Sequence, residues 1–250
     1  MWGEFINIAA LVLTLIGSYL FLLLLSNVAL KSILKHLDRL IAQTDIHQVT
    51  LTEPSLSYLV EKRIFDILFS LLGLLLFLPI FLVVAIAIKL ESKGPVLYKQ
   101  KRIGLNGNFF WSYKFRVRVT FSPKDIADGK FLSPFDPEIT RVGRILILTG
   151  LNELPGLINV LKGDMSIVGR SQILDYNIPN HIISSEERKI LLTVKPGLVS
   201  LWAILSDHIQ FNPQRIIELD FYYLQKRSLS FDIKVALSSL IVILGTTSKY

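Results

Sequence analysis

The sequence predicts an α+β membrane protein. An N-terminal transmembrane helix and a re-entrant membrane hairpin precede a small, mainly helical cytosolic domain, which carries a short β-hairpin and interfacial amphipathic helices. Three features predict this fold class: an uncharged run over residues 5–30, an apolar run over residues 64–88 that contains Pro79, and alternating runs around Asn106–Gly107. The composition agrees, because 51% hydrophobic residues and a mean hydropathy of +0.50 exceed what ordinary soluble domains carry.

The run over residues 5–30 is long enough to cross a bilayer as one helix. It exceeds the apolar part of a signal peptide and has no basic segment before it, so we expect it to stay in the mature protein. Cations that follow it (Lys31, Lys35 and Arg39) place the N-terminus outside and the rest of the chain inside. The predicted organisation is a transmembrane helix with a basic flank over 1–40, a linker over 41–60 and one domain over 61–250.

The run over residues 64–88 is the element around which the domain is organised. Lys62 and Arg63 precede it and further cations follow it, so a straight span would leave one basic cluster on the wrong side. Pro79 removes a backbone donor and can bend the helix, which favours a hairpin that enters and leaves one leaflet. Asp66, one turn in, can reach the headgroups or pair with either cation. A plain bent span is the alternative.

The positive charge lies in the domain. The formal net charge is +7, although residues 1–61 hold only three Lys or Arg against five acids. A basic domain beside a membrane suits anionic lipids, nucleotides or sugar phosphates. No helix-turn-helix, RNP or zinc-finger pattern is present, so nucleic acid is not an expected partner. The chain has no cysteine, and its four histidines lack metal-helix spacing.

Two motifs in the domain suit phosphate. After the turn at Asn106–Gly107, the strand-like run 108–119 places Lys114, Arg116 and Arg118 on one side, and either phosphate binding or a solvated edge strand explains that row. Within residues 139–171, Asn152 can cap a short helix whose first turn holds Pro155 and which Gly163 can end. A helix start beside cations is an anion site. Those cations are Arg141, Arg144 and Lys162.

The C-terminal third predicts further helices. Residues 181–194 are helical in pattern, Lys195–Pro196–Gly197 forms a turn, and two helices follow Pro213. The last one, near 231–244, is too short to span and either lies in the interface or packs on the hairpin. Aromatic residues in this region serve as headgroup anchors or as core: Trp202, Tyr222 and Tyr223.

From Glu61 onward the chain resembles the bacterial sugar transferases, the monotopic phosphoglycosyl transferases that begin exopolysaccharide and glycan assembly on a polyprenyl phosphate. The resemblance covers about three quarters of the chain. Its motifs occur in the family's order: KRIFDILFS with the Pro79 hairpin, GPVLYKQKRIGLNG, KFR at 114–116, ITRVGR at 139–144, NELP at 152–155, NVLKGDMSIVG at 159–169, KPGLVSLW at 195–202 and LDFYYLQKRSLSFDI at 219–233.

The resemblance implies a two-step transfer at the cytoplasmic face of the bacterial inner membrane. An Asp of an Asp-Glu pair attacks a UDP-sugar and releases UMP, and a polyprenyl phosphate then takes the phosphosugar; splitting one displacement in two is the advantage of a covalent route. The pair falls on Asn152–Glu153, with Mg²⁺ held by Glu153. The implied phosphate and nucleotide-sugar ligands are Lys114, Arg116, Arg141, Arg144, Arg170 and Lys195. A homo-oligomer or a partner transferase is a further expected contact.

The chain departs from the family at the implied nucleophile, since the amide of Asn152 is uncharged and a poor nucleophile. Nearby, Ile147–Leu148 stand where the family usually has Arg-Lys, and Arg170–Ser171–Gln172 where it usually has Pro-Arg-Pro. Three hypotheses follow. The chain is a transferase that uses Glu153 or transfers directly, or a catalytically silent member that binds nucleotide sugar or lipid phosphate or scaffolds an active partner. The third is a cationic membrane-surface module for anionic lipids or nucleic acid.

Overall fold

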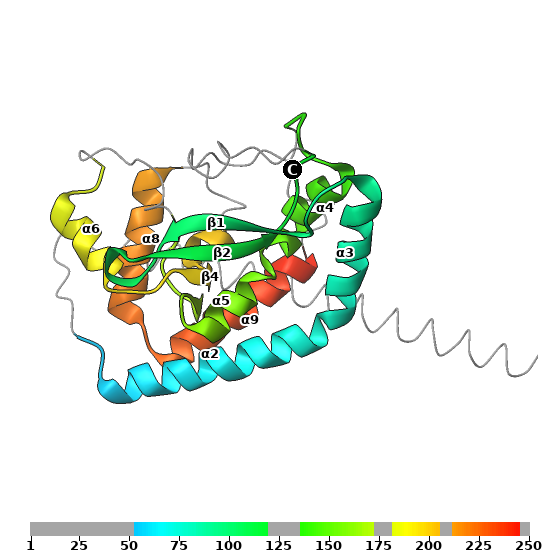
Figure 1. Ribbon diagram of the computed structural model, residues 1–250. Coiled ribbons are helices and arrows are strands. Elements are labelled where there is room, and N and C mark those ends of the chain that lie inside the picture. Colours follow the sequence, from blue (N-terminus) through cyan, green and yellow to red (C-terminus); the bar gives the residue numbers. More distant parts are fainter. Residues whose placement is uncertain (1–52, 120–135, 173–181, 206–211, 246–250) are drawn as a thin grey trace, which may run out of the picture.

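A computed structural model describes residues 53–119, 136–172, 182–205 and 212–245 (Figure 1). The expected transmembrane helix over residues 5–30 lies outside these ranges. In the described part helices surround two small sheets, so the predicted mixed α/β domain with a short β-hairpin is confirmed. No single helix there is long and apolar enough to cross a bilayer. Two bent helix pairs meet that test by length and composition: 56–91, bent by 59°, and 141–162, bent by 91°.

The first bent pair is the predicted hairpin. Helix α2 (Leu56–Leu76) begins at Ser55, whose side chain accepts a hydrogen bond from the Tyr58 N–H, and α3 (Leu78–Glu91) follows after Phe77. The break lies at Phe77, two residues before Pro79, so the predicted bend is present and lies on the N-terminal side of the proline. Pro79 lies in the first turn of α3, where its missing N–H leaves no hydrogen bond unmade.

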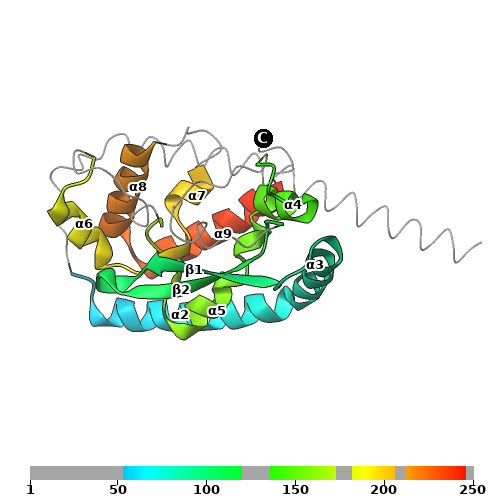
Figure 2. The same cartoon turned by 45° about the horizontal axis from the view of Figure 1, so that its top comes forward.

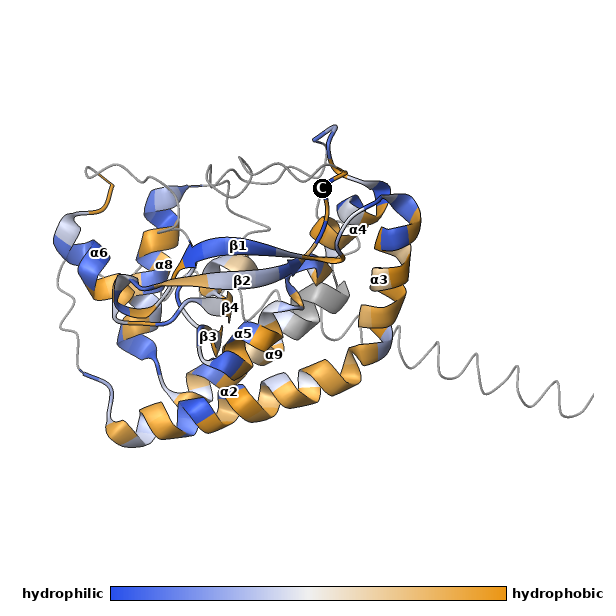
Figure 3. Ribbon diagram, in the orientation of Figure 1, coloured by the Kyte–Doolittle hydropathy of each residue, from blue (hydrophilic) through white to orange (hydrophobic). Residues whose placement is uncertain are grey.

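Helix α2 presents its apolar side outward. Its buried positions are the polar or small residues Lys62, Asp66, Ser70 and Gly73. Figure 3 shows the apolar colour running along α2 and α3 at the edge of the molecule. A helix with this pattern has its apolar side available to lipid. Exposed apolar side chains of the pair include Ile64, Leu68, Leu71, Leu72, Leu75, Leu76, Leu82, Val83, Ile86 and Leu90.

The β-hairpin follows α3. Strand β1 (Leu97–Ile103) pairs antiparallel with β2 (Phe109–Phe115), with Arg102 opposite Phe110 and Tyr98 opposite Lys114. The connection is a short 3₁₀ turn, η2 (Leu105–Gly107), in which Asn106 has φ 54° and Gly107 φ 80°. Asn and Gly tolerate the left-handed region, which explains why this dipeptide marks the turn. Strand β2 stops at Phe115, earlier than the expected run.

The second bent pair contains the implied catalytic residues. Helix α4 (Arg141–Thr149) is capped by Thr140 and followed by the 3₁₀ turn η4 (Leu151–Glu153) and α5 (Gly156–Lys162). Gly163 ends α5 with φ 89°, as predicted. Asn152 does not cap that helix: it lies inside η4, and the cap position of α5 is Pro155, which makes no side-chain cap hydrogen bond.

The remaining elements close the fold. The predicted helices appear as α6 (Ser185–Leu192), α8 (Pro213–Lys226) and α9 (Leu229–Gly245), with a short α7 (Leu201–Leu205) between α6 and α8. A parallel pair of three-residue strands, β3 (Ser166–Val168) and β4 (Gly197–Val199), was not predicted. In the view of Figure 2, α7 lies above β1 and β2, and α2 lies below them.

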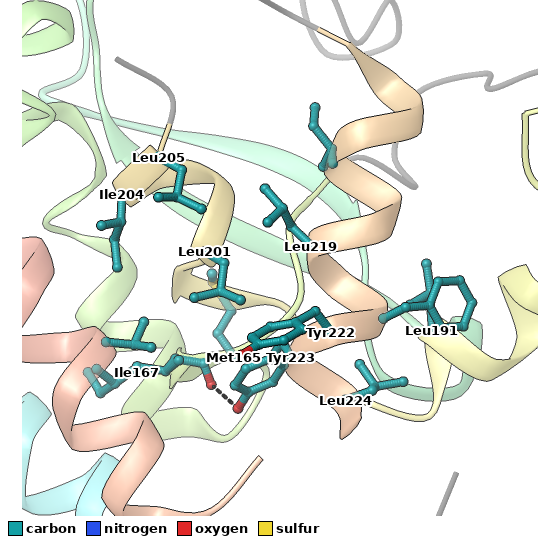
Figure 4. Packing of buried hydrophobic residues seen from close by; sticks show 14 of the residues in the cluster. Met165, Ile167, Leu191, Leu201, Ile204, Leu205, Leu219, Tyr222, Tyr223 and Leu224 are labelled. Atoms are coloured by element: carbon teal, nitrogen blue, oxygen red, sulfur yellow. Dashed lines mark hydrogen bonds between the residues drawn. The ribbon is translucent and has the colours of Figure 1, made fainter. Parts of the chain in front are cut away.

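The core lies between β3, α7 and α8. Figure 4 shows Tyr223 among the leucines and isoleucines of this cluster, with its hydroxyl donating to the Val168 carbonyl at 3.2 Å. Tyr222 is also buried, and Trp202 packs against the cluster, so core packing and not headgroup anchoring accounts for these aromatics. Helix α9 packs on the hairpin, since Asp232 accepts a hydrogen bond from Tyr58 of α2 at 2.9 Å.

Candidate active site

The centre of the site is an ion pair between β2 and η4. The Lys114 Nζ donates to Glu153 Oε1 at 2.5 Å, and the side chains are 10% and 37% exposed. Alternation along β2 turns Lys114 inward with Phe110 and Ser112, which are buried. The solvated edge strand that the sequence left open is therefore wrong for Lys114. A buried ammonium thus meets a carboxylate that solvent can still reach.

Two cations keep Glu153 ionised. Burial by itself would raise the pKa of this carboxyl, but the charge of Lys114, its hydrogen bond and the charge of Arg102 together lower the pKa below its ordinary value. Arg102 lies on β1 and is buried, and its Nη2 donates to the side-chain oxygen of Gln100 at 2.6 Å. A carboxylate whose ionised form is favoured by two cations suits binding or attack at a phosphoryl group.

Asn152 precedes this carboxylate in η4. It is 9% exposed, and within the described part of the chain its side chain makes no hydrogen bond. The 3₁₀ turn is held by backbone bonds, among them Glu153 N–H to the Gly150 carbonyl at 3.2 Å. Asn152 is thus placed beside Glu153 by the turn and not by contacts of its own amide.

Arg116 lies next to the site but serves the hairpin. Its Nη1 and Nη2 donate to the carbonyls of Lys93 and Ser92, both at 2.8 Å. These carbonyls follow the end of α3, where acceptors otherwise lack partners. Arg116 is buried, so it is not the solvated cation of an edge strand. Both of its terminal guanidinium nitrogens donate to backbone carbonyls.

Arg141 and Arg144 lie on α4, with exposed side chains. The N-terminus of α4, the kind of place predicted to hold an anion, is instead taken by Glu91 from the end of α3. The Glu91 carboxylate accepts from the N–H groups of Arg141 at 2.6 Å and Val142 at 2.9 Å. The hairpin is thus joined to α4 at this end by the Glu91 carboxylate.

Arg170 is a structural residue in the described fold and not a phosphate ligand. It is 0% exposed, and its guanidinium donates to the carbonyls of Ile103, Gly104, Ser171 and Val194 at 2.7–3.3 Å. It therefore ties β1 to the loops around β3 and β4, and these contacts overturn the expectation that it binds phosphate.

Lys195 lies elsewhere, just before β4. Burial and the charge of Arg63 lower its pKa, against the attraction of Asp66 and Asp164. Arg63 and Asp66 belong to α2, so Lys195 lies near the N-terminal half of that helix. The described contacts do not place it with Lys114 and Glu153.

Charged residues of α2 join the hairpin to β3, α5 and α9. Asp66 pairs with Lys62 at 3.7 Å, as the sequence allowed, and accepts from Ser166 Oγ at 2.9 Å and Ile167 N–H at 3.0 Å. Lys62 also meets Asp232 of α9 at 3.1 Å. Arg63 donates to the Val160 and Leu161 carbonyls at 2.7 Å, which caps α5. Asp66 is thus buried against β3 and does not reach toward headgroups.

The site offers Mg²⁺ one carboxylate, that of Glu153. Among the described residues no three His, Cys, Asp or Glu side chains gather as a metal site. Glu153 offers one carboxylate, with Lys114 on Oε1. Mg²⁺ in phosphate chemistry is commonly held by one or two carboxylates, with substrate phosphates and water completing its shell. Glu153 is the residue that would contribute to such a shell.

Sequence reasoning missed Arg102 and Glu91. Arg102 is one of the cations that follow the run 64–88, and its position on the buried face of β1 depends on a strand register that the sequence does not give. The two-residue spacing of Gln100 and Arg102 is the signal that could have placed both on one face. Glu91 gives no local signal, since its partners are fifty residues away.

Comparison with known proteins identifies the family. The bacterial sugar transferase model matches residues 57–246. The chain is 34% identical to a UDP-glucose:undecaprenyl-phosphate glucose-1-phosphate transferase of Caulobacter vibrioides, over 79% of the chain and 74% of the relative. It is 37% identical to galactosyl transferase CpsE of Streptococcus agalactiae (77% and 44%). It is also 37% identical to a UDP-N-acetylgalactosamine-undecaprenyl-phosphate N-acetylgalactosaminephosphotransferase of Aeromonas hydrophila, over 76% of the chain and 45% of the relative. The chain therefore spans less than half the length of the Streptococcus and Aeromonas proteins. The chain therefore belongs to the bacterial sugar transferase family.

Proposed function

We propose that this chain transfers a phosphosugar from a UDP-sugar to a polyprenyl phosphate, the first step of a membrane-bound glycan. The observation that carries the proposal is the half-exposed Glu153 carboxylate, kept ionised by Lys114 beside the membrane hairpin. Charged groups fixed in a partly dry site are what phosphoryl transfer requires, because positioning and electrostatics supply most of its acceleration. Family membership supports the same activity.

Lys114 and Glu153 have distinct roles in this reaction. When the nucleotide diphosphate binds, Lys114 donates to a phosphate oxygen and so turns from the carboxylate toward the substrate. The bond between the sugar-bearing phosphorus and the bridging oxygen is broken, and UMP leaves with that oxygen. The sugar-bearing phosphorus forms its new bond either to a Glu153 oxygen, which a polyprenyl phosphate oxygen displaces in a second step, or directly to that polyprenyl phosphate oxygen. Mg²⁺ held at Glu153, if bound with the substrate, neutralises phosphate charge.

Asn152 affects the covalent route and not the direct one. Its amide is a poor nucleophile, so the covalent route in this chain needs Glu153, the carboxylate of the same turn. Direct transfer needs no protein nucleophile and leaves Glu153 to hold metal and orient phosphate. Asn152→Asp would supply the acid that the family places there, and it therefore separates an altered enzyme from a silent one.

The hairpin explains where the substrates meet. Its outward apolar side chains suit one leaflet of the bacterial inner membrane, and Arg116 and Glu91 join its α3 end to β2 and α4, the elements that flank Glu153. A lipid phosphate at the membrane surface and a soluble UDP-sugar then reach one centre from two sides. We place that centre on the cytoplasmic side, where UDP-sugars are found and where basic segments are retained.

The test is UMP release from nanodisc-held protein with Mg²⁺, undecaprenyl phosphate and a panel of UDP-sugars. We expect UMP from the wild type and its loss in Glu153→Gln. Lys101→Gln, on the exposed side of β1, is the matched surface control and retains activity. Release only from Asn152→Asp would show a silenced enzyme, and release from neither protein with any sugar would contradict the proposal.

A further inference from the structure

A side chain of α5 pairs with the edge of β2 that faces away from β1. Strand β2 belongs to a two-stranded sheet, so only one of its edges is paired by a strand. At the other edge, Asn159 Oδ1 accepts from the Tyr113 N–H at 2.9 Å, and Asn159 Nδ2 donates to the Trp111 carbonyl at 2.7 Å. One side-chain amide thus makes the two hydrogen bonds that a residue of a neighbouring strand would make.

The Asn159 amide has one orientation. It is 0% exposed, and its Nδ2 also donates to Asp164 Oδ2 at 3.2 Å. Turning the amide over would place its NH₂ group against the Tyr113 N–H and its oxygen against the Trp111 carbonyl, so two buried donors and two buried acceptors would face each other. The contact between α5 and β2 is therefore fixed.

A second contact joins the same two segments. Lys114 follows Tyr113 in β2, and its Nζ donates to Glu153 Oε1 in η4. Backbone hydrogen bonds of 3.0–3.2 Å continue η4 into α5, so Glu153 and Asn159 belong to one connected segment. The two contacts differ in their access to solvent, since the Glu153 side chain is 37% exposed and Asn159 is 0% exposed. A phosphate can therefore compete for the ion pair but not for the Asn159 amide.

We propose that Asn159 is a positioning residue for Lys114. Its two bonds hold β2 against the η4–α5 segment, so that Lys114 can leave Glu153 for a phosphate oxygen of the UDP-sugar while its backbone stays in place. This inference rests on the proposed function, since the change of partner is the one that donor binding causes. Without the Asn159 bonds, the ion pair would have to hold β2 against η4, and substrate binding would break the contact that places Lys114.

The test is a double-mutant cycle on the Kd for UDP, measured by calorimetry on the full chain in nanodiscs. Asn159→Ala is expected to raise the Kd about threefold to tenfold, the range for the net contribution of one hydrogen bond. In the Lys114→Gln background the same change is expected to leave the Kd within about twofold, because Asn159 acts through Lys114. Equal effects of Asn159→Ala in the two backgrounds would overturn the inference.

Val160→Ala is the matched control for loss of stability. Val160 follows Asn159 in α5, is also 0% exposed and belongs to the hydrophobic core. Its truncation is expected to lower the melting temperature and to leave the Kd for UDP unchanged. A rise in Kd equal to that of Asn159→Ala would show that any weakening of α5 impairs binding, and would overturn the inference.

The Tyr113 amide offers a measurement that needs no variant. Its hydrogen exchange in the wild-type protein is expected to be equally slow with and without saturating UDP, because the Asn159 bond persists when Lys114 changes partner. Faster exchange of this amide in the UDP complex would overturn the inference, and this result decides the matter if Asn159→Ala does not fold. A Lys114-dependent effect of Asn159→Ala on UDP binding, in protein that releases no UMP, would refute only the proposed reaction.

Discussion

Replacing Lys114 by Gln tests the electrostatics of the site. The Lys114–Glu153 pair joins a 10% exposed side chain to one that is 37% exposed. Exposed ion pairs contribute about 0–1 kcal/mol, and breaking a buried pair costs about 3–5 kcal/mol. Because solvent screens the Glu153 side of the pair, we expect Lys114→Gln to lower the free energy of unfolding by about 1–3 kcal/mol.

The same change alters the pH dependence. Burial is the largest influence on the Glu153 pKa and raises it, so without Lys114 only Arg102 opposes that rise and the pKa increases. A carboxyl whose pKa is lowered by folding stabilises the protein above its unfolded pKa, and this contribution is lost as pH falls through the folded pKa. The variant loses ionised Glu153, and with it UMP release, at a higher pH than the wild type.

The assay is the pH profile of UMP release, with unfolding followed in parallel across the acidic range. Lys114→Arg keeps a cation at the same place and is expected to return the acidic limb toward that of the wild type. An acidic limb at the same pH in Lys114→Gln and wild type would refute the view that this ion pair keeps the working carboxylate ionised.

Three further predictions concern the fold that supports the site. Burial raises the pKa of Asp220 from 3.8 to about 6 against hydrogen bonds from Ser171 and the charge of Arg170, so folding takes up a proton and stability falls as pH rises from about 4 to above 6. Asp220→Asn should remove this pH-dependent change of about 3 kcal/mol in the free energy of unfolding; an unchanged pH dependence would contradict it. Arg170→Met should lower stability by about 2–4 kcal/mol by leaving carbonyls without donors, while the UDP Kd of the folded fraction stays the same; a weaker Kd would restore a phosphate role. Gly143→Ala should lower the melting temperature, because the new Cβ would lie 2.1 Å from the Val117 carbonyl oxygen; an unchanged melting temperature would show that this contact relaxes freely.

Local patterns predicted much of the fold. Apolar length and flanking charge gave the hairpin, alternation with Asn106–Gly107 gave the β-hairpin, and periodicity gave the last two helices. Each of these signals is contained within a few turns of helix or one strand pair. The bend lies two residues before Pro79, because a proline disturbs the turn that precedes it and is favoured in the first turn of the next helix.

Long-range contacts were beyond the sequence. Arginines that look alike along the chain differ in what lies around them: Arg116 and Arg170 meet carbonyls, and Arg102 meets Gln100 and the field of Glu153. Three-residue strands such as β3 and β4 carry too little pattern to predict their pairing. The family motifs pointed to Lys114 and Glu153 separately, and the contact between them depends on the positions of β2 and η4, which the motifs do not give.

The most direct measurement of the central claim is the mass of the lipid formed from undecaprenyl phosphate and a UDP-sugar in nanodiscs. Wild-type protein should yield the undecaprenyl diphosphate sugar together with an equal amount of UMP, and Glu153→Gln should yield neither. Free sugar phosphate without a lipid product, or the same lipid product from Glu153→Gln, would contradict the account.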